Sequence, residues 1–176
     1  MKICSRFESI EALQGAYLVH TNCADIKIYF VTDEIVRVRA SFDKELAEES
    51  YILSTTAWED RLDGFLGDER TRKEAVVPEV VEEENTISFA TAEVKLVLQK
   101  NPIGFKLYDK EGSLLYSDLE GNPFVLDSNN RVVHYSRMAE DDCFYGFGEK
   151  TGDLNKNNCF LRERATDAMG YNPKKC

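Results

Sequence analysis

The two histidines and the acidic clusters of this 176-residue chain are the side chains whose types could support acid–base or metal chemistry. His20 and His134 lie far apart in the chain, and no cysteine stands at the spacing of a zinc site. In the acidic run 60–70, Leu62 and Gly64 occupy the third and fifth positions, where a calcium loop needs side-chain oxygens. We therefore expect no metal and no cofactor.

The motif Gly146-Phe147-Gly148 is the main glycine signal, and it is followed directly by Glu149. A serine hydrolase elbow, a P-loop and a complete dinucleotide fingerprint are missing from the sequence. Glycines in a strand permit a bulge or a close backbone approach, which would direct Glu149 and the loop after it away from the sheet. We expect Gly146 and Gly148 to shape this loop and Glu149 to orient it rather than to catalyse.

The elements that position these residues are predicted to be β-strands, because apolar and polar side chains alternate with a period of two along much of the sequence. Residues 25–31 and 36–40 alternate apolar with polar side chains and predict a hairpin with one wet face. A helical pattern is scarce, with a turn or two expected over 43–50 behind Asp43. Further strands are expected at 16–20, 51–54, 75–81, 86–89, 93–99, 103–108, 113–116, 124–126 and 131–136.

Many short strands separated by turn residues predict an all-β chain, an antiparallel β-sandwich or barrel with little helix. The length favours a single domain, because 176 residues with 43% hydrophobic content can build one core. Pro78 cannot donate to a ladder, so its strand is expected at a sheet edge or split.

The charge and the cysteines restrict the partners and the compartment. A net charge of −10 disfavours nucleic acid and anionic membranes, which need a field of lysine and arginine. No apolar run is long enough for a membrane span, and the first residues do not read as a secretory signal. Five widely spaced cysteines favour reduced thiols, so we expect a cytoplasmic location.

The stretch 144–152, F-Y-G-F-G-E-K-T-G, continues into Leu154-Asn155-Lys156 and later into Thr166-Asp167-Ala168-Met169-Gly170. Together these residues resemble the signature that closes the N-terminal domain of family 31 glycoside hydrolases, the α-glucosidase family. Residues 24–39 and 96–112 also resemble two of that family's strand pairs.

This resemblance implies a supersandwich similar in fold to galactose mutarotase over residues 1–149. Residues 150–176 would be a loop or tail of the same domain, leading toward a catalytic (β/α)8 barrel that this chain does not contain. In the family two barrel aspartates act as nucleophile and general acid of a retaining mechanism, with their carboxyl groups about 5–5.5 Å apart. The chain would therefore hold no catalytic residue, would be inactive alone, and would shape the pocket for an α-glucoside or oligosaccharide.

Asp167 matches the family's aspartate in the motif N-T-D, which implies a contact with sugar on the leaving-group side of the cleavage point. The sequence departs from the family at two places. Asn157-Asn158 stand where an Arg-Gly pair is usual, and Ala165 replaces the asparagine of that motif. The local net charge of 150–176 is positive, as expected either for a solvated tail or for a segment that lies against an acidic surface.

Two other functions remain open from the residues alone. A free-standing sugar isomerase of the mutarotase type needs a general acid and base around the sugar, for which His134 and Glu149 are the available pair. A carbohydrate-binding module would need an exposed aromatic platform, and eight Tyr and ten Phe allow one.

Overall fold

The computed structural model describes residues 1–46, 55–57, 71–73, 76–121, 123–148 and 152–161. Every regular element in this part of the chain is a β-strand, which confirms the all-β prediction. The strands are β1 (Lys2–Cys4), β2 (Phe7–Leu13), β3 (Ala16–Thr21), β4 (Asp25–Phe30), β5 (Val36–Ser41), β6 (Thr55–Ala57), β7 (Thr71–Lys73), β8 (Glu79–Glu82), β9 (Thr86–Ala90), β10 (Val94–Lys100), β11 (Ile103–Asp109), β12 (Leu114–Ser117), β13 (Phe124–Leu126) and β14 (Val132–His134).

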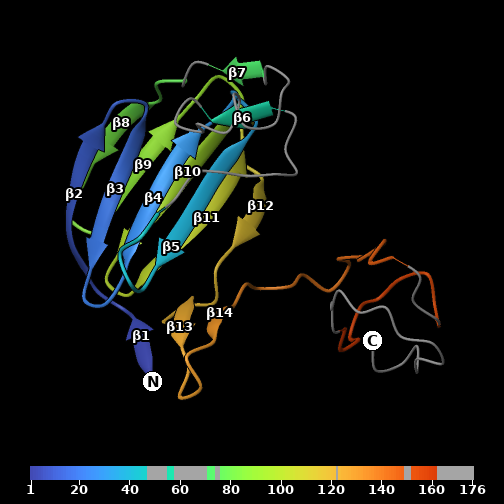
Figure 1. Cartoon of the computed structure of the whole chain (residues 1–176). Coiled ribbons are helices and arrows are strands. Elements are labelled where there is room, and N and C mark those ends of the chain that lie inside the picture. The colour runs from blue at the N-terminus through green and yellow to red at the C-terminus, as the bar shows by residue number, and fades with distance from the viewer. Residues whose placement is uncertain (47–54, 58–70, 74–75, 122, 149–151, 162–176) are drawn as a thin grey trace. The chain divides into compact units, whose positions relative to one another are not determined.

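Two antiparallel sheets form the body of the fold (Figure 1). One has the order β12-β11-β10-β9-β8 and the other the order β2-β3-β4-β5. A smaller antiparallel sheet has the order β1-β13-β14, and β6 and β7 form a short parallel pair. Sequence neighbours pair throughout the two large sheets, as expected for strands joined by tight turns.

The core lies between the two large sheets and confirms the sandwich. Side chains that alternate along β4 meet side chains that alternate along β9 and β10, so one face of each sheet is apolar. Phe89 of β9 is fully buried, with its ring centroid 4.9 Å from that of Tyr17 and 5.9 Å from that of Phe30. These aromatic contacts join the two sheets directly.

The predicted hairpin is present as β4 and β5, but its expected wet face is wrong. All six residues of β4 are buried, including Lys27 at 9% exposure and Tyr29 at 0%. Lys27 Nζ lies 5.0 Å and the Arg37 guanidinium carbon 5.7 Å from the centroid of the Tyr29 ring. The aliphatic stems of such cations cover an aromatic face while the charge interacts with its π-system, so burial does not require apolar residues.

Other predicted elements differ in detail. The strand predicted over 75–81 begins only after Pro78: β8 starts at Glu79 and lies at the end of its sheet among the described strands, so Pro78, which has no amide donor, stays outside the ladder. The expected helical turn is wrong over 43–46, where Asp43 Oδ1 accepts from the amide of Glu45 at 3.1 Å in a local turn; residues 47–50 lie outside the described residues. The strand expected at 51–54 also lies outside them, and β1, β2, β6 and β7 were not predicted.

The chain divides into two compact units, Met1–Arg137 and Met138–Cys176. The first unit contains every strand found in the described residues. The predicted boundary between residues 149 and 150 stays a prediction. No helix in the described part of the chain has the length and apolar character needed to cross a bilayer.

Replacing Phe89 by Ala should destabilise the sandwich by about 3–5 kcal/mol, because the substitution opens a cavity where the two sheets meet. Urea unfolding followed by circular dichroism measures this difference. Val81→Ala is the matched control, since Val81 of β8 is 47% exposed and should cost well under 1 kcal/mol. Equal losses for the two variants would contradict the assigned core.

Candidate functional site

The structure describes two of the four predicted site residues. Gly146 and Gly148 lie in the second unit, while Glu149 and Asp167 lie outside the described residues. The roles of all four residues therefore stay predictions. The candidate site that the structure describes is the loop that carries the two glycines.

Gly146 and Gly148 do not lie in a strand, so that part of the expectation is wrong. Gly146, Phe147 and Gly148 have φ angles of 94°, 65° and 67°, three successive residues in the left-handed region. Such a run turns the backbone too sharply for a ladder, and only glycine adopts it without steric cost. A Cβ added at either glycine would meet no atom within 4 Å, so backbone conformation rather than crowding accounts for glycine here.

Asn155 closes this loop by hydrogen bonds. Its side-chain oxygen accepts from the amides of Phe144 at 2.9 Å and Asn157 at 3.0 Å. The Lys156 amide donates to the Phe144 carbonyl at 2.7 Å, and Asn157 Nδ2 donates to the carbonyl of Asp142 at 3.0 Å. The two halves of the motif, 144–148 and 154–157, are therefore held together although they are separated in sequence.

Large apolar side chains on this loop are exposed. Tyr145 is 58% exposed, Leu154 80% and Phe160 89%, and Phe144 and Phe147 are also exposed. Large apolar side chains exposed in this number suit contact with another protein domain or with a ligand. We call the described residues 144–148 and 152–161, with these side chains, the aromatic loop.

A second cluster, unpredicted except for His134, surrounds Asp118 in the first unit. Its carboxylate is buried, with Oδ2 accepting from the Phe105 amide at 2.8 Å and Oδ1 lying 2.9 Å from His134 Nε2. Tyr116 Oη also donates to Oδ1 and lies 3.0 Å from the same histidine nitrogen. The His134 ring stacks on Phe124 with a centroid separation of 4.7 Å.

The surroundings of Tyr116 change its acidity. Burial raises the pKa of the phenol above its ordinary value of 10, and the hydrogen bond to the Asp118 carboxylate and that negative charge raise it further. Tyr116 therefore remains a neutral donor at physiological pH. The structure gives His134 the partner Asp118, while its predicted partner Glu149 lies outside the described residues.

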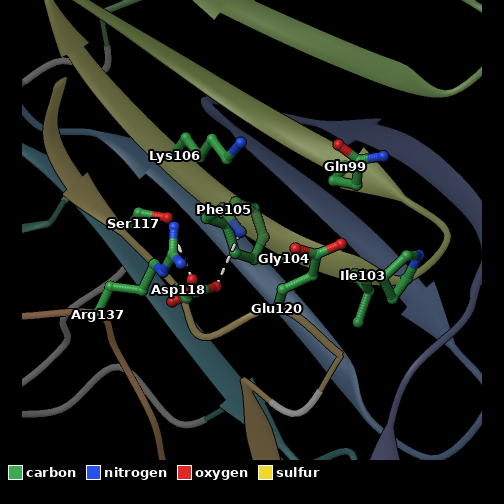
Figure 2. A pocket seen from close by; sticks show the side chains of 10 residues that line it. Gln99, Ile103, Gly104, Phe105, Lys106, Ser117, Asp118, Glu120 and Arg137 are labelled. Atoms are coloured by element: carbon green, nitrogen blue, oxygen red, sulfur yellow. Dashed lines mark hydrogen bonds between the residues drawn. The ribbon is translucent and has the colours of Figure 1, made fainter. Parts of the chain in front are cut away.

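Asp118 also borders a small cavity of about 110 Å³ (Figure 2). The cavity is also lined by the charged residues Lys106, Glu120 and Arg137. Figure 2 shows the hydrogen bond from the Phe105 amide to the Asp118 carboxylate as a dashed line. Small-molecule sites commonly measure about 300–1,000 Å³. The cavity is therefore too small to be the principal binding site of a saccharide.

The sequence contained no local signal for the Asp118 cluster. Tyr116 lies in β12 and Asp118 directly follows that strand, whereas His134 ends β14; the bridge between Asp118 and Ser136 brings these segments together. Such a contact depends on the pairing of strands that are not neighbours in sequence.

Asp118→Asn should lower the pKa of Tyr116, because it removes the negative charge, while burial should keep the value above 10. The pH dependence of the tyrosine Cζ resonance measures this shift, and Tyr116→Phe assigns the signal. Asp127→Asn removes a carboxylate that binds Arg131 and should leave the resonance unchanged. An unaltered Tyr116 titration in Asp118→Asn would show that the carboxylate does not act on the phenol.

Comparison with known proteins finds one matching family model and one related enzyme. Residues 25–175 match the family model described as the glycosyl hydrolase 31 N-terminal galactose mutarotase-like domain. The chain is 30% identical over 163 residues to Alpha-glucosidase 2 of Bacillus thermoamyloliquefaciens. The aligned residues cover 92% of this chain and 19% of that relative. The chain thus spans about a fifth of the length of this relative.

Solved structures agree on the fold. A family 31 dextranase of Flavobacterium johnsoniae complexed with glucose superposes with a TM-score of 0.66 at 23% identity, over 89% of this chain and 18% of that chain. The cycloalternan-forming enzyme of Listeria monocytogenes in complex with a pentasaccharide substrate gives 0.65 at 14% identity, over 88% and 14%. Because the family model matches most of the sequence, the chain belongs to the N-terminal galactose mutarotase-like domains of glycoside hydrolase family 31.

Proposed function

We propose that this chain is the non-catalytic N-terminal domain of a retaining α-glucosidase, which hydrolyses α-linked glucosides or oligosaccharides in the cytoplasm. The match over 25–175 to the family 31 domain carries this proposal, because it includes the whole aromatic loop. The similarity to Alpha-glucosidase 2 supports a glucoside as substrate.

The domain would contribute by contact rather than by chemistry. A loop closed by Asn155 presents Tyr145, Leu154 and Phe160 as apolar surface, which suits docking against a neighbouring domain. We propose that this neighbour is the catalytic (β/α)8 barrel of the same polypeptide, reached through residues 150–176, and that residues 1–149 form the supporting sandwich. Glu149 would orient the loop, and Asp167 would bind sugar.

The Asp118 cluster supports a structural role for the Asp118 carboxylate. Both oxygens of Asp118 are occupied by hydrogen bonds from the chain itself, and Tyr116 is held neutral beside them. A carboxylate whose oxygens already accept from three donors has little capacity to move a proton of a bound sugar.

Asp167→Ala in the full-length enzyme should lower kcat/KM for an α-linked disaccharide by roughly 10- to 150-fold, because a charged hydrogen bond to substrate is worth about 1.5–3 kcal/mol. The loss for an aryl α-glucoside should be smaller, since that substrate lacks the hydroxyl groups of the second sugar. Steady-state kinetics on the two substrates measures the difference.

Asp153→Ala is the matched control, since it removes an exposed acid from the same segment 150–176 of the sequence and should change neither rate by more than about twofold. If Asp167 only ordered the loop, both substrates would lose equally and the thermal midpoint would fall. Equal losses would therefore reject the binding role of Asp167.

A further inference from the structure

An apolar groove of about 450 Å³ opens in the first unit between β5 of one sheet and β11 and β12 of the other. Eight of its lining residues are apolar, and the polar ones are Tyr116, Asp118 and His134. The inward side chains of β5 form one wall and those of β10 and β11 form the floor: Val36, Val38, Ala40, Leu96, Phe105 and Leu107.

The backbone of β5 is prepared to accept another strand. The Val31 amide donates to the Ile35 carbonyl, and this bond sets the alternation of hydrogen-bonded pairs along β4 and β5. Arg37 and Arg39 therefore bond to β4, while the amides and carbonyls of Val36, Val38 and Ala40 point to the other edge. Among the described strands, β5 pairs with β4 alone, so these groups take no partner from them.

The chemistry of the groove favours apolar side chains over a sugar. The oxygens of Asp118 already accept from Phe105, Tyr116 and His134, and the Tyr116 hydroxyl is engaged with them. A saccharide would bury hydroxyl groups against Val38 and Leu107 with few partners, at a cost of about 1–3 kcal/mol for each unpaired group. A strand instead places alternate apolar side chains in the groove and satisfies the edge of β5.

We propose that this groove receives a β-strand from the part of the full-length polypeptide that lies outside this chain, added to β5 antiparallel or parallel with its apolar side chains over Leu96 and Leu107. The inference rests on the proposed function, in which the chain is one domain of a longer enzyme. The length of the relative supports the occupant, because about four-fifths of it lies outside the matched part. The domain would then be held to the rest of the enzyme by main-chain hydrogen bonds.

Hydrogen exchange with mass spectrometry on the full-length enzyme tests this proposal. The outward amides of Val36, Val38 and Ala40 should exchange about 100-fold more slowly than free edge amides, because they would join a ladder. The control within the same molecule is β8 (Glu79–Glu82), which among the described strands pairs with β9 alone and should keep fast-exchanging amides on its other edge. Exchange of β5 as fast as that of β8 would overturn the proposal.

The variant Val38→Arg identifies the added strand, because a charged side chain in the groove should displace that strand from β5. The expected result is faster exchange at β5 together with one peptide from outside residues 1–176. Loss of the β5 protection on dilution of the unmodified enzyme would instead assign the groove to a second copy and overturn the proposal. Hydrolysis of an aryl α-glucoside by the same sample separates this proposal from the proposed function. An enzyme that is active but whose β5 amides exchange fast would overturn the strand proposal and leave the proposed function standing.

Discussion

The packing of Phe89 against Tyr17 and Phe30 holds the two large sheets against each other. It joins the inner faces of two sheets that share no ladder, and neither sheet could bury its apolar face without the other. Once the sheets are packed in this way, β5 and β12 lie on opposite sides of the apolar groove. The groove, the buried face of β4 and the position of Asp118 all follow from that arrangement.

Asp118 shows how a polar group can serve such a fold. A buried carboxylate is costly unless its oxygens are satisfied, and here the Phe105 amide, Tyr116 and His134 supply the donors. Those donors come from β11, β12 and β14, so the hydrogen bonds fix where the small sheet meets the large one. The cluster thus acts as a positioning device between strands, and its chemistry agrees with a domain that supports rather than catalyses.

The period-two pattern predicted the strands from β3 to β5 and from β8 to β14 because each has apolar and polar sides or clear turn residues around it. It missed β2, whose sequence F-E-S-I-E-A-L is largely exposed and has no regular apolar face. The burial of Lys27 could not be predicted either, since it depends on Tyr29 and Arg37 lying beside it on the folded sheet. The glycine motif indicated the loop that follows it but not that the glycines themselves leave the strand. The closure by Asn155 and the pairing of Asp118 with His134 required contacts that only the folded chain contains.

We propose that this domain builds part of an active site whose catalytic groups lie elsewhere in the enzyme. Hydrolysis of an aryl α-glucoside, measured for the purified chain and for the full-length enzyme, tests it most directly. We expect turnover by the full-length enzyme and none by the chain alone, because a retaining mechanism needs two opposed carboxyl groups. Steady turnover by the chain alone, abolished by substituting one of its own acids, would contradict it.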